Sequence, residues 1–264
     1  MKTALITGAL GGMGKATVKE LIRLGYEVYG LDIKEAEEFK GFHYYKSDLT
    51  SEKSISDTFA LIKEKVDHFD VIIHLSGIYD LNSLVEMSEK DFISIFDINV
   101  FACYRINKIF LPLLKENSKI IITTSELAPL DPLPFTGIYG ISKTTLEKYA
   151  YSLRMELQLL NIKVIVVRPG AVDTGLLNVS LDKLEKFKQN TTHYVYNAKK
   201  FYEIVNKVES KKIPPEKIAR VMGKIINKKK PKYLYNINRN PLLKLLNVLP
   251  RRMQNHIIKR ILTK

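Results

Sequence analysis

Short apolar runs alternate with longer segments of helical periodicity over the first two thirds of the chain. The runs cover residues 3–6, 27–31, 71–73, 120–123 and 164–167 and are rich in residues that favour strands. Four of them are apolar throughout, which is typical of strands that are buried on both faces. Strands that alternate with helices predict parallel strands joined by crossover helices. We therefore expect an α/β fold with a doubly wound parallel β-sheet flanked by helices.

The length and composition of the chain predict a single domain that spans residues 1–264. With 264 residues, 45% of them hydrophobic, the chain can bury a full core within one α/β domain. The strand–helix rhythm fades over residues 176–212, where charged residues surround five aromatic side chains. This segment is either a substrate lid or a set of surface helices with ordinary packing aromatics.

Positive charge is concentrated in residues 213–264, which we expect to form a basic C-terminal helical extension. The formal net charge is +14, yet residues 211–264 hold sixteen Lys or Arg and a single acid, Glu216. Because the rest of the chain is nearly neutral, we expect no nucleic-acid partner. Residues 242–249 and 251–262 predict amphipathic helices with leucine- or isoleucine-rich faces. These helices either settle on an anionic membrane or pack against the core or a second subunit.

Targeting and metal signals are weak in this sequence. Cys103 is the single cysteine and no stretch resembles a secretory signal, so we expect a reducing, cytoplasmic setting, with peripheral membrane contact left open. No uninterrupted apolar run reaches the roughly 18 residues that a spanning helix requires. No cluster of His, Cys, Asp and Glu has metal-ligand spacing, and we predict no metal site.

A glycine-rich turn over residues 7–14 follows the first predicted strand and opens a helical pattern. Glycines at such a place let the backbone approach a pyrophosphate closely, with helix N–H groups facing the phosphates. A merely structural turn is the alternative, although the position between strand and helix favours a dinucleotide site. Asp32 closes the second strand, where a carboxylate accepts hydrogen bonds from ribose hydroxyls and repels a 2′-phosphate, unless it serves as a turn or cap residue. The pattern therefore favours NAD over NADP.

Tyr139 and Lys143 are separated by four positions and therefore share one face of a predicted helix. The lysine ammonium, together with a positively charged nicotinamide ring, would lower the tyrosine pKa from about 10 toward working pH. Tyr139 would then serve as a general acid and base. Without other motifs, a tyrosine and a lysine at this spacing usually form an ordinary solvated helix face.

A Thr-Gly-x-x-x-Gly-x-Gly pattern at residues 7–14 is followed by the Tyr-x-x-x-Lys pattern of Tyr139 and Lys143. With these two motifs, the chain resembles the short-chain dehydrogenase/reductase family over roughly residues 1–175. The resemblance implies a Rossmann-like domain that carries a catalytic serine and a catalytic asparagine. Ser125 would hold the substrate oxygen, with Thr124 as an alternative, although the interval to Tyr139 is one residue longer than is usual in the family. The resemblance implies that Asn99 holds a water linking Lys143 to solvent; alternatively, its amide only satisfies backbone groups.

The resemblance also implies how the cofactor would be held. Asp48 would contact the adenine amino group, and the segment from Pro169 to Thr174 would cradle the nicotinamide. His74 departs from the family pattern, and we assign it no chemistry. The expected catalytic residues are Asn99, Ser125, Tyr139 and Lys143. The expected cofactor-binding residues are Gly8, Leu10, Gly12, Met13, Gly14, Asp32, Asp48, Leu49, Gly77, Tyr139, Lys143, Pro169, Gly170, Val172 and Thr174.

These patterns predict an NAD-dependent oxidoreductase that interconverts a secondary alcohol and a ketone. The basic tail resembles those of family members that act on steroids and retinoids, which implies a hydrophobic substrate such as a hydroxysteroid. Small ketones, sugars and acyl-chain ketones stay open as alternatives. The family resemblance also implies a homodimer or homotetramer formed through the helices that carry Asn99 and Tyr139. A non-catalytic dinucleotide sensor that binds a partner or a membrane through its basic tail is the alternative function.

Overall fold

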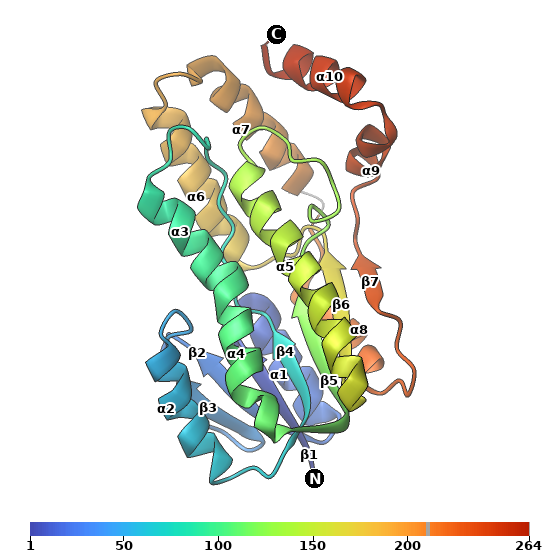
Figure 1. The fold of residues 1–264 in the computed structure, drawn as a ribbon. Helices are drawn as coiled ribbons and strands as arrows, with labels where there is room; N and C mark the ends of the chain where they lie inside the picture. Colours follow the sequence, from blue (N-terminus) through green and yellow to red (C-terminus); the bar gives the residue numbers. More distant parts are fainter. Residues whose placement is uncertain (210–211, 264) are drawn as a thin grey trace.

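The computed structural model describes residues 1–209 and 212–263 (Figure 1). Residues 210, 211 and 264 lie outside the described residues, so the ranges 176–212 and 213–264 predicted above are described except at those positions. The chain starts at the lower end of the view in Figure 1, and its C-terminal helices lie at the opposite end.

Seven parallel strands form the central sheet in the order β3-β2-β1-β4-β5-β6-β7. The strand order reverses between β1 and β4, and this switch point leaves a crevice at the carboxyl ends of these strands. The predicted doubly wound parallel sheet is therefore confirmed. The strands are β1 Lys2–Thr7, β2 Tyr26–Asp32, β3 Phe42–Lys46, β4 Phe69–His74, β5 Leu114–Thr123, β6 Lys163–Pro169 and β7 Leu234–Ile237.

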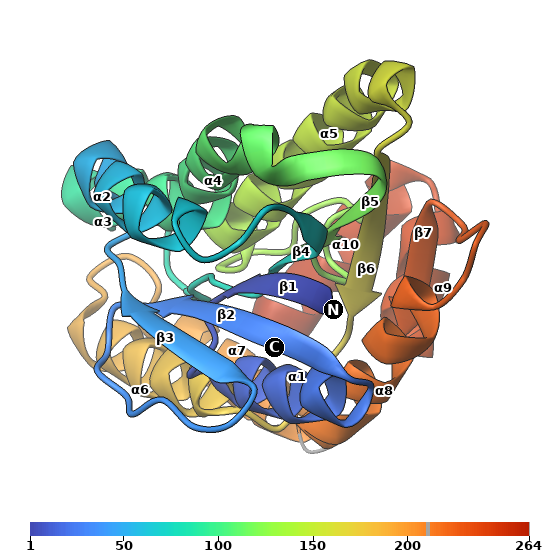
Figure 2. The same cartoon turned by 90° about the horizontal axis from the view of Figure 1, so that it is seen from below.

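Helices cover both faces of this sheet. Figure 2 shows α2, α4 and α5 on one face and α1 and α8 on the other. The central strands are consequently buried on both faces, with Leu5 and Ile72 in one core cluster and Ile6 and Ile73 in the other. The helices are α1 Gly12–Arg23, α2 Glu52–Lys63, α3 Glu89–Phe96, η1 Asp97–Phe101, α4 Ala102–Phe110, η2 Leu111–Leu113, α5 Gly137–Leu157, η3 Gln158–Leu160, α6 Gly175–Asn190, α7 Val195–Glu209, α8 Pro215–Ile226, α9 Pro241–Val248 and α10 Arg251–Thr263.

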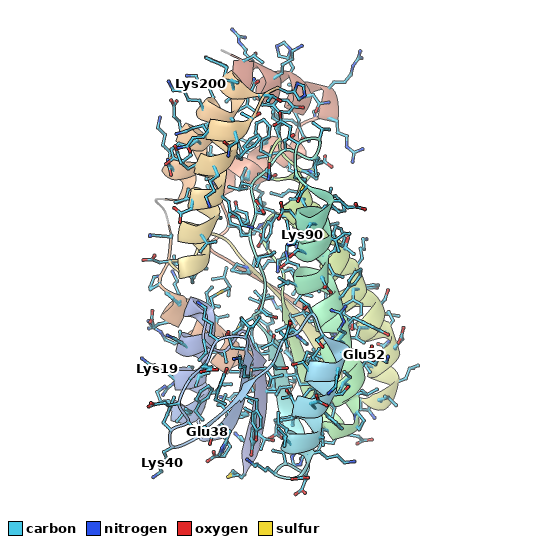
Figure 3. The ribbon with its side chains drawn as sticks, turned by 90° about the vertical axis from the view of Figure 1, so that its left-hand side faces the viewer. Lys19, Glu38, Lys40, Glu52, Lys90 and Lys200 are labelled. Atoms are coloured by element: carbon cyan, nitrogen blue, oxygen red, sulfur yellow. The ribbon has the colours of Figure 1, made fainter. Side chains whose placement is uncertain are left out.

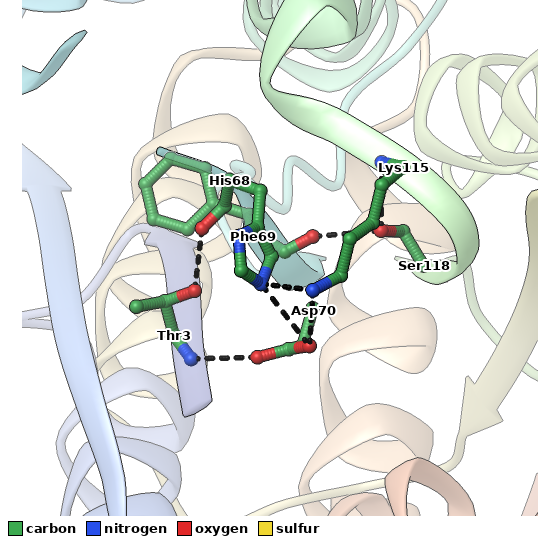
Figure 4. Close-up of polar contacts among 6 residues, drawn as sticks. All are labelled: Thr3, His68, Phe69, Asp70, Lys115 and Ser118. Carbon is green, nitrogen blue, oxygen red and sulfur yellow. Dashed lines mark hydrogen bonds and ion pairs between the residues drawn. The ribbon is translucent and has the colours of Figure 1, made fainter. Parts of the chain in front are cut away.

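Polar contacts join the amino ends of the central strands, at the end of the sheet opposite to the crevice (Figure 4). The Thr3 amide donates to Asp70 Oδ2 at 2.8 Å, and the Thr3 hydroxyl donates to the His68 carbonyl at 2.6 Å. The Ser118 hydroxyl donates to the Phe69 carbonyl at 2.8 Å. These bonds fix β1, β4 and β5 at their amino ends and leave their carboxyl ends to shape the crevice.

The segment after β6 contains two helices, α6 and α7, whose aromatic side chains are largely packed. Phe187 and Phe201 are buried with Leu81 and Phe135 in a third apolar cluster, to which Leu262 of α10 also belongs. This cluster lies beyond the carboxyl ends of the strands, as Figure 1 shows for α6, α7 and α10. The segment therefore forms a packed wall above the crevice.

The C-terminal region contributes to the sheet layers as well as to the surface. Helix α8 packs on α1, and β7 adds a parallel strand beside β6. Two helices end the described chain, α9 from Pro241 to Val248 and α10 from Arg251 to Thr263. Charged side chains such as Lys19, Lys90 and Lys200 extend outward in Figure 3. Among the described residues, no helix is long and apolar enough to cross a membrane.

Candidate active site

The glycine-rich turn packs against the loops that follow β4 and β6. Gly8 has a φ of +67°, and a Cβ there would lie 2.7 Å from the Ser76 backbone nitrogen. A Cβ on Gly12 would lie 2.7 Å from the Thr174 methyl group. Gly14 is buried in the first turn of α1. Only glycine lets the turn approach both loops so closely, so these three segments meet at the switch point.

Asp32 lies at the end of β2 beside this turn. Its Oδ2 accepts a hydrogen bond from the Leu10 backbone N–H at 3.0 Å, and its Oδ1 accepts one from the Lys34 N–H at 3.2 Å. The contact of this carboxylate with ribose hydroxyls stays a prediction. The glycine cradle and this carboxylate fit the adenosine half of a dinucleotide.

Asp48 and Leu49 follow β3 at the same edge of the sheet. Asp48 Oδ1 accepts from both the backbone N–H and the hydroxyl of Thr50, at 2.9 and 2.7 Å. The Leu49 carbonyl accepts from the Arg105 guanidinium at 3.2 Å. In this structure both residues therefore shape a turn, and their contact with adenine stays a prediction.

The segment after β6 is fastened to the C-terminal region. The Gly170 N–H donates to the Ile237 carbonyl at 2.8 Å, and Val172 forms a bridge with Ile213. Pro169 is the last residue of β6, and Thr174 is the residue directly before α6. These contacts hold the segment over the crevice, where the sequence predicts the nicotinamide.

Tyr139 lies in the first turn of α5 with its ring in the crevice. It is half-buried, and its ring packs edge-on against Tyr79, with the centroids 4.5 Å apart. Burial raises the pKa of Tyr139 to about 12, whereas the Ser125 hydroxyl lowers this pKa and the charge of the nearby Glu126 raises it further. The Ser125 oxygen accepts from the Leu127 N–H at 3.2 Å, which leaves its own hydrogen to donate. The phenol and the Ser125 hydroxyl line the same cavity, as acid/base chemistry on a shared substrate oxygen requires.

Lys143 points toward the same site from the next turn of α5. Its Nζ lies 5.8 Å from the centroid of the Tyr139 ring and donates to the Thr123 carbonyl at 3.3 Å. The residue is 5% exposed, and this burial lowers the pKa of Lys143 to about 8. A Cβ on Gly77 would lie 3.4 Å from this nitrogen, so the absent side chain leaves room for the ammonium.

Asn99 lies in the π-helical turn η1 and fastens the loop after β4. Its Oδ1 accepts from the Ile78 N–H at 2.8 Å, while its Nδ2 donates to the Ile78 carbonyl and to the Ser142 hydroxyl, both at 3.0 Å. Oδ1 would also lie 3.1 Å from a Cβ on Gly77, on the same side as Lys143 Nζ. The amide is therefore satisfied by protein groups, and it positions the loop that borders Lys143.

The two candidate hydroxyls after β5 have different partners. The Thr124 hydroxyl is 3.5 Å from Glu147 Oε2, and its backbone N–H donates to the Val167 carbonyl at 2.9 Å. Ser125 instead lies close enough to Tyr139 to lower the pKa of that phenol. This geometry favours Ser125 for the substrate oxygen despite the unusual spacing.

His74 is a buried residue that forms a hydrogen bond with Asn107. Its Nε2 lies 2.8 Å from Asn107 Oδ1, and Asn107 in turn donates to the Tyr149 hydroxyl at 3.1 Å. Burial lowers the pKa of His74 to about 4, so the ring is neutral near pH 7. The residue completes a buried network under the site.

A cavity of about 190 Å³ opens beside Tyr139. The predicted site residues that line it are Met13, Gly77, Ser125, Tyr139, Lys143, Pro169, Gly170, Val172 and Thr174. Within the described residues, no three His, Cys, Asp or Glu side chains come together as metal ligands would.

Sequence reasoning missed part of the cavity wall, which comes from distant segments. The lining residues outside the predicted sets include Tyr79, Glu126, Leu133 and Leu243. Phe201, Ile204 and Val205 of α7 also line the cavity, and they lie in residues 176–212, for which a substrate lid was one of the two interpretations. Because Leu243 belongs to α9, two C-terminal helices close the cavity.

Several known proteins resemble this chain in sequence. A family model described as short chain dehydrogenase matches residues 2–185. A probable short-chain type dehydrogenase/reductase VdlC from Helicobacter pylori is 30% identical, and the alignment covers 94% of this chain and 93% of that protein. A 3-ketodihydrosphingosine reductase from Bacteroides thetaiotaomicron is 27% identical, with 92% and 89% covered. Estradiol 17-beta-dehydrogenase 2 from Mus musculus is 28% identical, with 70% and 52% covered.

The fold is also shared with solved structures. A short chain dehydrogenase family protein from Francisella tularensis superposes with a TM-score of 0.75 at 25% identity, covering 90% of this chain and 97% of that one. The family match spans the glycine-rich turn, Ser125, Tyr139 and Lys143 together. The chain therefore belongs to the short-chain dehydrogenase/reductase family and is an oxidoreductase that resembles steroid dehydrogenases.

Proposed function

We propose that this protein interconverts a secondary alcohol and a ketone with NAD, using Tyr139 as the catalytic acid and base. The observation that carries the proposal is the convergence of Tyr139, Ser125 and Lys143 on one cavity. When bound, the nicotinamide cofactor supplies or accepts the hydride. The glycine-rich turn would hold its pyrophosphate, Asp32 its ribose, and the segment from Pro169 to Thr174 its nicotinamide.

The side chains of the site would move a proton at the substrate oxygen. During reduction, the Tyr139 hydroxyl donates its proton to the carbonyl oxygen, while the Ser125 hydroxyl donates a hydrogen bond to the same atom. The Lys143 ammonium stabilises the phenolate that remains. Asn99 Oδ1 accepts one hydrogen bond from the protein, and its second acceptor site would hold the water through which Lys143 exchanges protons with solvent. During oxidation the same groups act in reverse.

The cavity wall supports a hydrophobic substrate such as a hydroxysteroid. Leu133, Phe201, Val205 and Leu243 give the cavity a largely apolar lining. Estradiol and 3-ketodihydrosphingosine, in the names of two similar proteins, are both largely apolar molecules. An apolar alcohol or ketone is therefore the substrate class that we propose.

We propose that α9 brings the cavity to an anionic membrane surface. Leu242, Leu245 and Val248 of this helix are 65–77% exposed, whereas Leu243 lines the cavity. The sequence after Glu216 contains cations and no acid. Apolar side chains among cations are typical of helices that lie in a membrane interface. Flotation with anionic and neutral vesicles tests this contact.

We also propose a homodimer or homotetramer formed through the helices η1–α4 and α5. Phe101 and Tyr104 on the first, and Tyr151 and Met155 on the second, are exposed large side chains. Covering them would bury apolar surface. Sedimentation velocity of the whole chain measures the assembly.

The activity is tested by NADH and NADPH formation with hydroxysteroids, retinol and small secondary alcohols. We expect NAD-dependent oxidation of hydrophobic alcohols and its loss in Tyr139→Phe. NAD binding without turnover of any alcohol would favour the dinucleotide sensor instead. A clear preference for NADP would refute the role of Asp32.

A further inference from the structure

The cavity beside Tyr139 contains a buried carboxylate that the proposed proton transfer does not use. Glu126 follows Ser125 directly and is 8% exposed. Among the described residues that line the cavity, Glu126 is the one acid. A buried carboxylate costs free energy unless other groups compensate its charge, so its place beside the reacting groups calls for an explanation.

Contacts from two directions fix the position of Glu126. Its backbone N–H donates to the Pro169 carbonyl at 2.9 Å, and its Oε2 accepts from the Asn240 N–H at 2.6 Å. The Asn240 side chain in turn caps α9 by accepting from the Leu242 N–H at 2.9 Å. The carboxylate is therefore held at the cavity wall and cannot simply turn out to solvent.

The second carboxylate oxygen of Glu126, Oε1, lies beside Gly170. A Cβ at position 170 would lie only 2.9 Å from Oε1, so the glycine leaves space for this oxygen. Burial raises the pKa of Glu126, while the Asn240 N–H and the nearby Arg239 favour the ionised form. An ionised carboxylate offers about four acceptor sites, and a cationic donor inside the cavity would satisfy the remaining ones.

We propose that Glu126 determines substrate specificity by binding an ammonium group on the carbon next to the reacting carbon. The preferred substrate is then an amino alcohol, or the matching amino ketone, with an apolar chain. This inference rests on the proposed function, because Ser125 and Tyr139 must hold the reacting oxygen. Ser125, Tyr139 and Glu126 line the same cavity, and Glu126 is close enough for its charge to act on Tyr139, so a cationic substituent next to the reacting carbon would face the carboxylate. Leu133, Phe201 and Leu243 would surround the chain.

Two alcohols of equal shape test the proposal in the NAD-dependent oxidation at pH 7. One is 2-amino-3-octanol, and the other is 2-methyl-3-octanol, in which a methyl group replaces the ammonium. We expect kcat/KM of the wild-type protein to be about 10- to 100-fold higher for the amino alcohol, as for a hydrogen-bonded buried charge pair. Glu126→Gln keeps an acceptor for the Asn240 N–H but removes the charge. In this variant we expect the ratio of kcat/KM for the two alcohols to fall to about one, because any effect of the lost charge on Tyr139 acts on both alcohols alike.

Other outcomes overturn the proposal. A wild-type protein that oxidises the methyl alcohol at least as well as the amino alcohol has no ammonium site. A Glu126→Gln variant that loses activity on both alcohols equally shows that Glu126 only anchors Asn240. If the wild-type protein oxidises neither of these alcohols and no alcohol of the larger panel, the proposed function itself is refuted. The missing activity on the methyl alcohol distinguishes this outcome from the mere absence of an ammonium site.

Discussion

Replacing Lys143 with methionine should abolish activity and yet stabilise the folded protein. Burial lowers the pKa of Lys143 from 10.5 to about 8. At about 1.4 kcal/mol for each tenfold change in proton affinity, the charged form costs the folded state about 3 kcal/mol. Methionine removes this cost but leaves the Thr123 carbonyl without its donor, which costs about 1 kcal/mol. The net gain of about 2 kcal/mol corresponds to a Tm higher by about 4–8 °C.

The pH dependence of this gain follows from the sign of the pKa shift. The pKa is lower in the folded than in the unfolded chain, so the unfolded state binds the proton more tightly. The penalty is therefore complete below pH 8, decreases as the pH rises, and is absent above about pH 10.5. Lys143→Met should consequently be more stable than the wild type at pH 7 and nearly equal to it at pH 10.5.

Denaturant unfolding of the cofactor-free protein at both pH values measures the effect. Lys148 is exposed on the same helix, so Lys148→Met serves as the matched control and should change the unfolding free energy by less than about 0.5 kcal/mol. Alcohol oxidation by Lys143→Met should fall at least about 100-fold, because the ammonium no longer stabilises the Tyr139 phenolate. A variant that is less stable at pH 7, or equally stabilised at both pH values, would refute the reasoning.

Four further substitutions probe the cofactor and substrate sites. Asp32→Ala should weaken NAD binding about tenfold or more and reduce the preference over NADP, as calorimetry with each dinucleotide would show. Unchanged NAD affinity would exclude the ribose contact. Gly12→Val places side-chain atoms against Thr174, so the free energy of unfolding should fall by about 1–3 kcal/mol together with the NAD affinity. Ser125→Ala should lower kcat about 100- to 1000-fold, whereas Thr124→Ala should lower it less than tenfold; the reverse order in steady-state kinetics would exchange their roles.

The sequence predicts those parts of the fold in which the pattern of apolar residues within one strand shows how that strand is buried. The apolar runs at β1, β4 and β6 are buried on both faces, and this alone separates a doubly wound sheet from a one-sided one. Strand β7 was missed because it has four residues and only β6 to pair with. Its pairing depends on contacts across some 70 positions, which periodicity does not record.

The candidate site divides in the same way. Tyr139 and Lys143 were recognisable because a single helix fixes their spacing, and the turn of residues 7–14 because a single loop contains it. No role was predicted for Glu126, since its burial depends on Asn240, more than a hundred positions away. The contribution of Leu243 to the cavity likewise follows from the placement of α9 after β7.

Hydride transfer dependent on Tyr139 is the central claim, and an isotope label tests it most directly. The protein is incubated with hydrophobic ketones, including steroid ketones and 3-octanone, and NADH that carries deuterium at both hydrogen positions of nicotinamide C4. Mass spectrometry should then find an alcohol with one deuterium on the carbinol carbon, formed at least about 100-fold more slowly by Tyr139→Phe. Absence of deuterated alcohol from every ketone despite NADH binding, or equal rates for the variant, would contradict the claim.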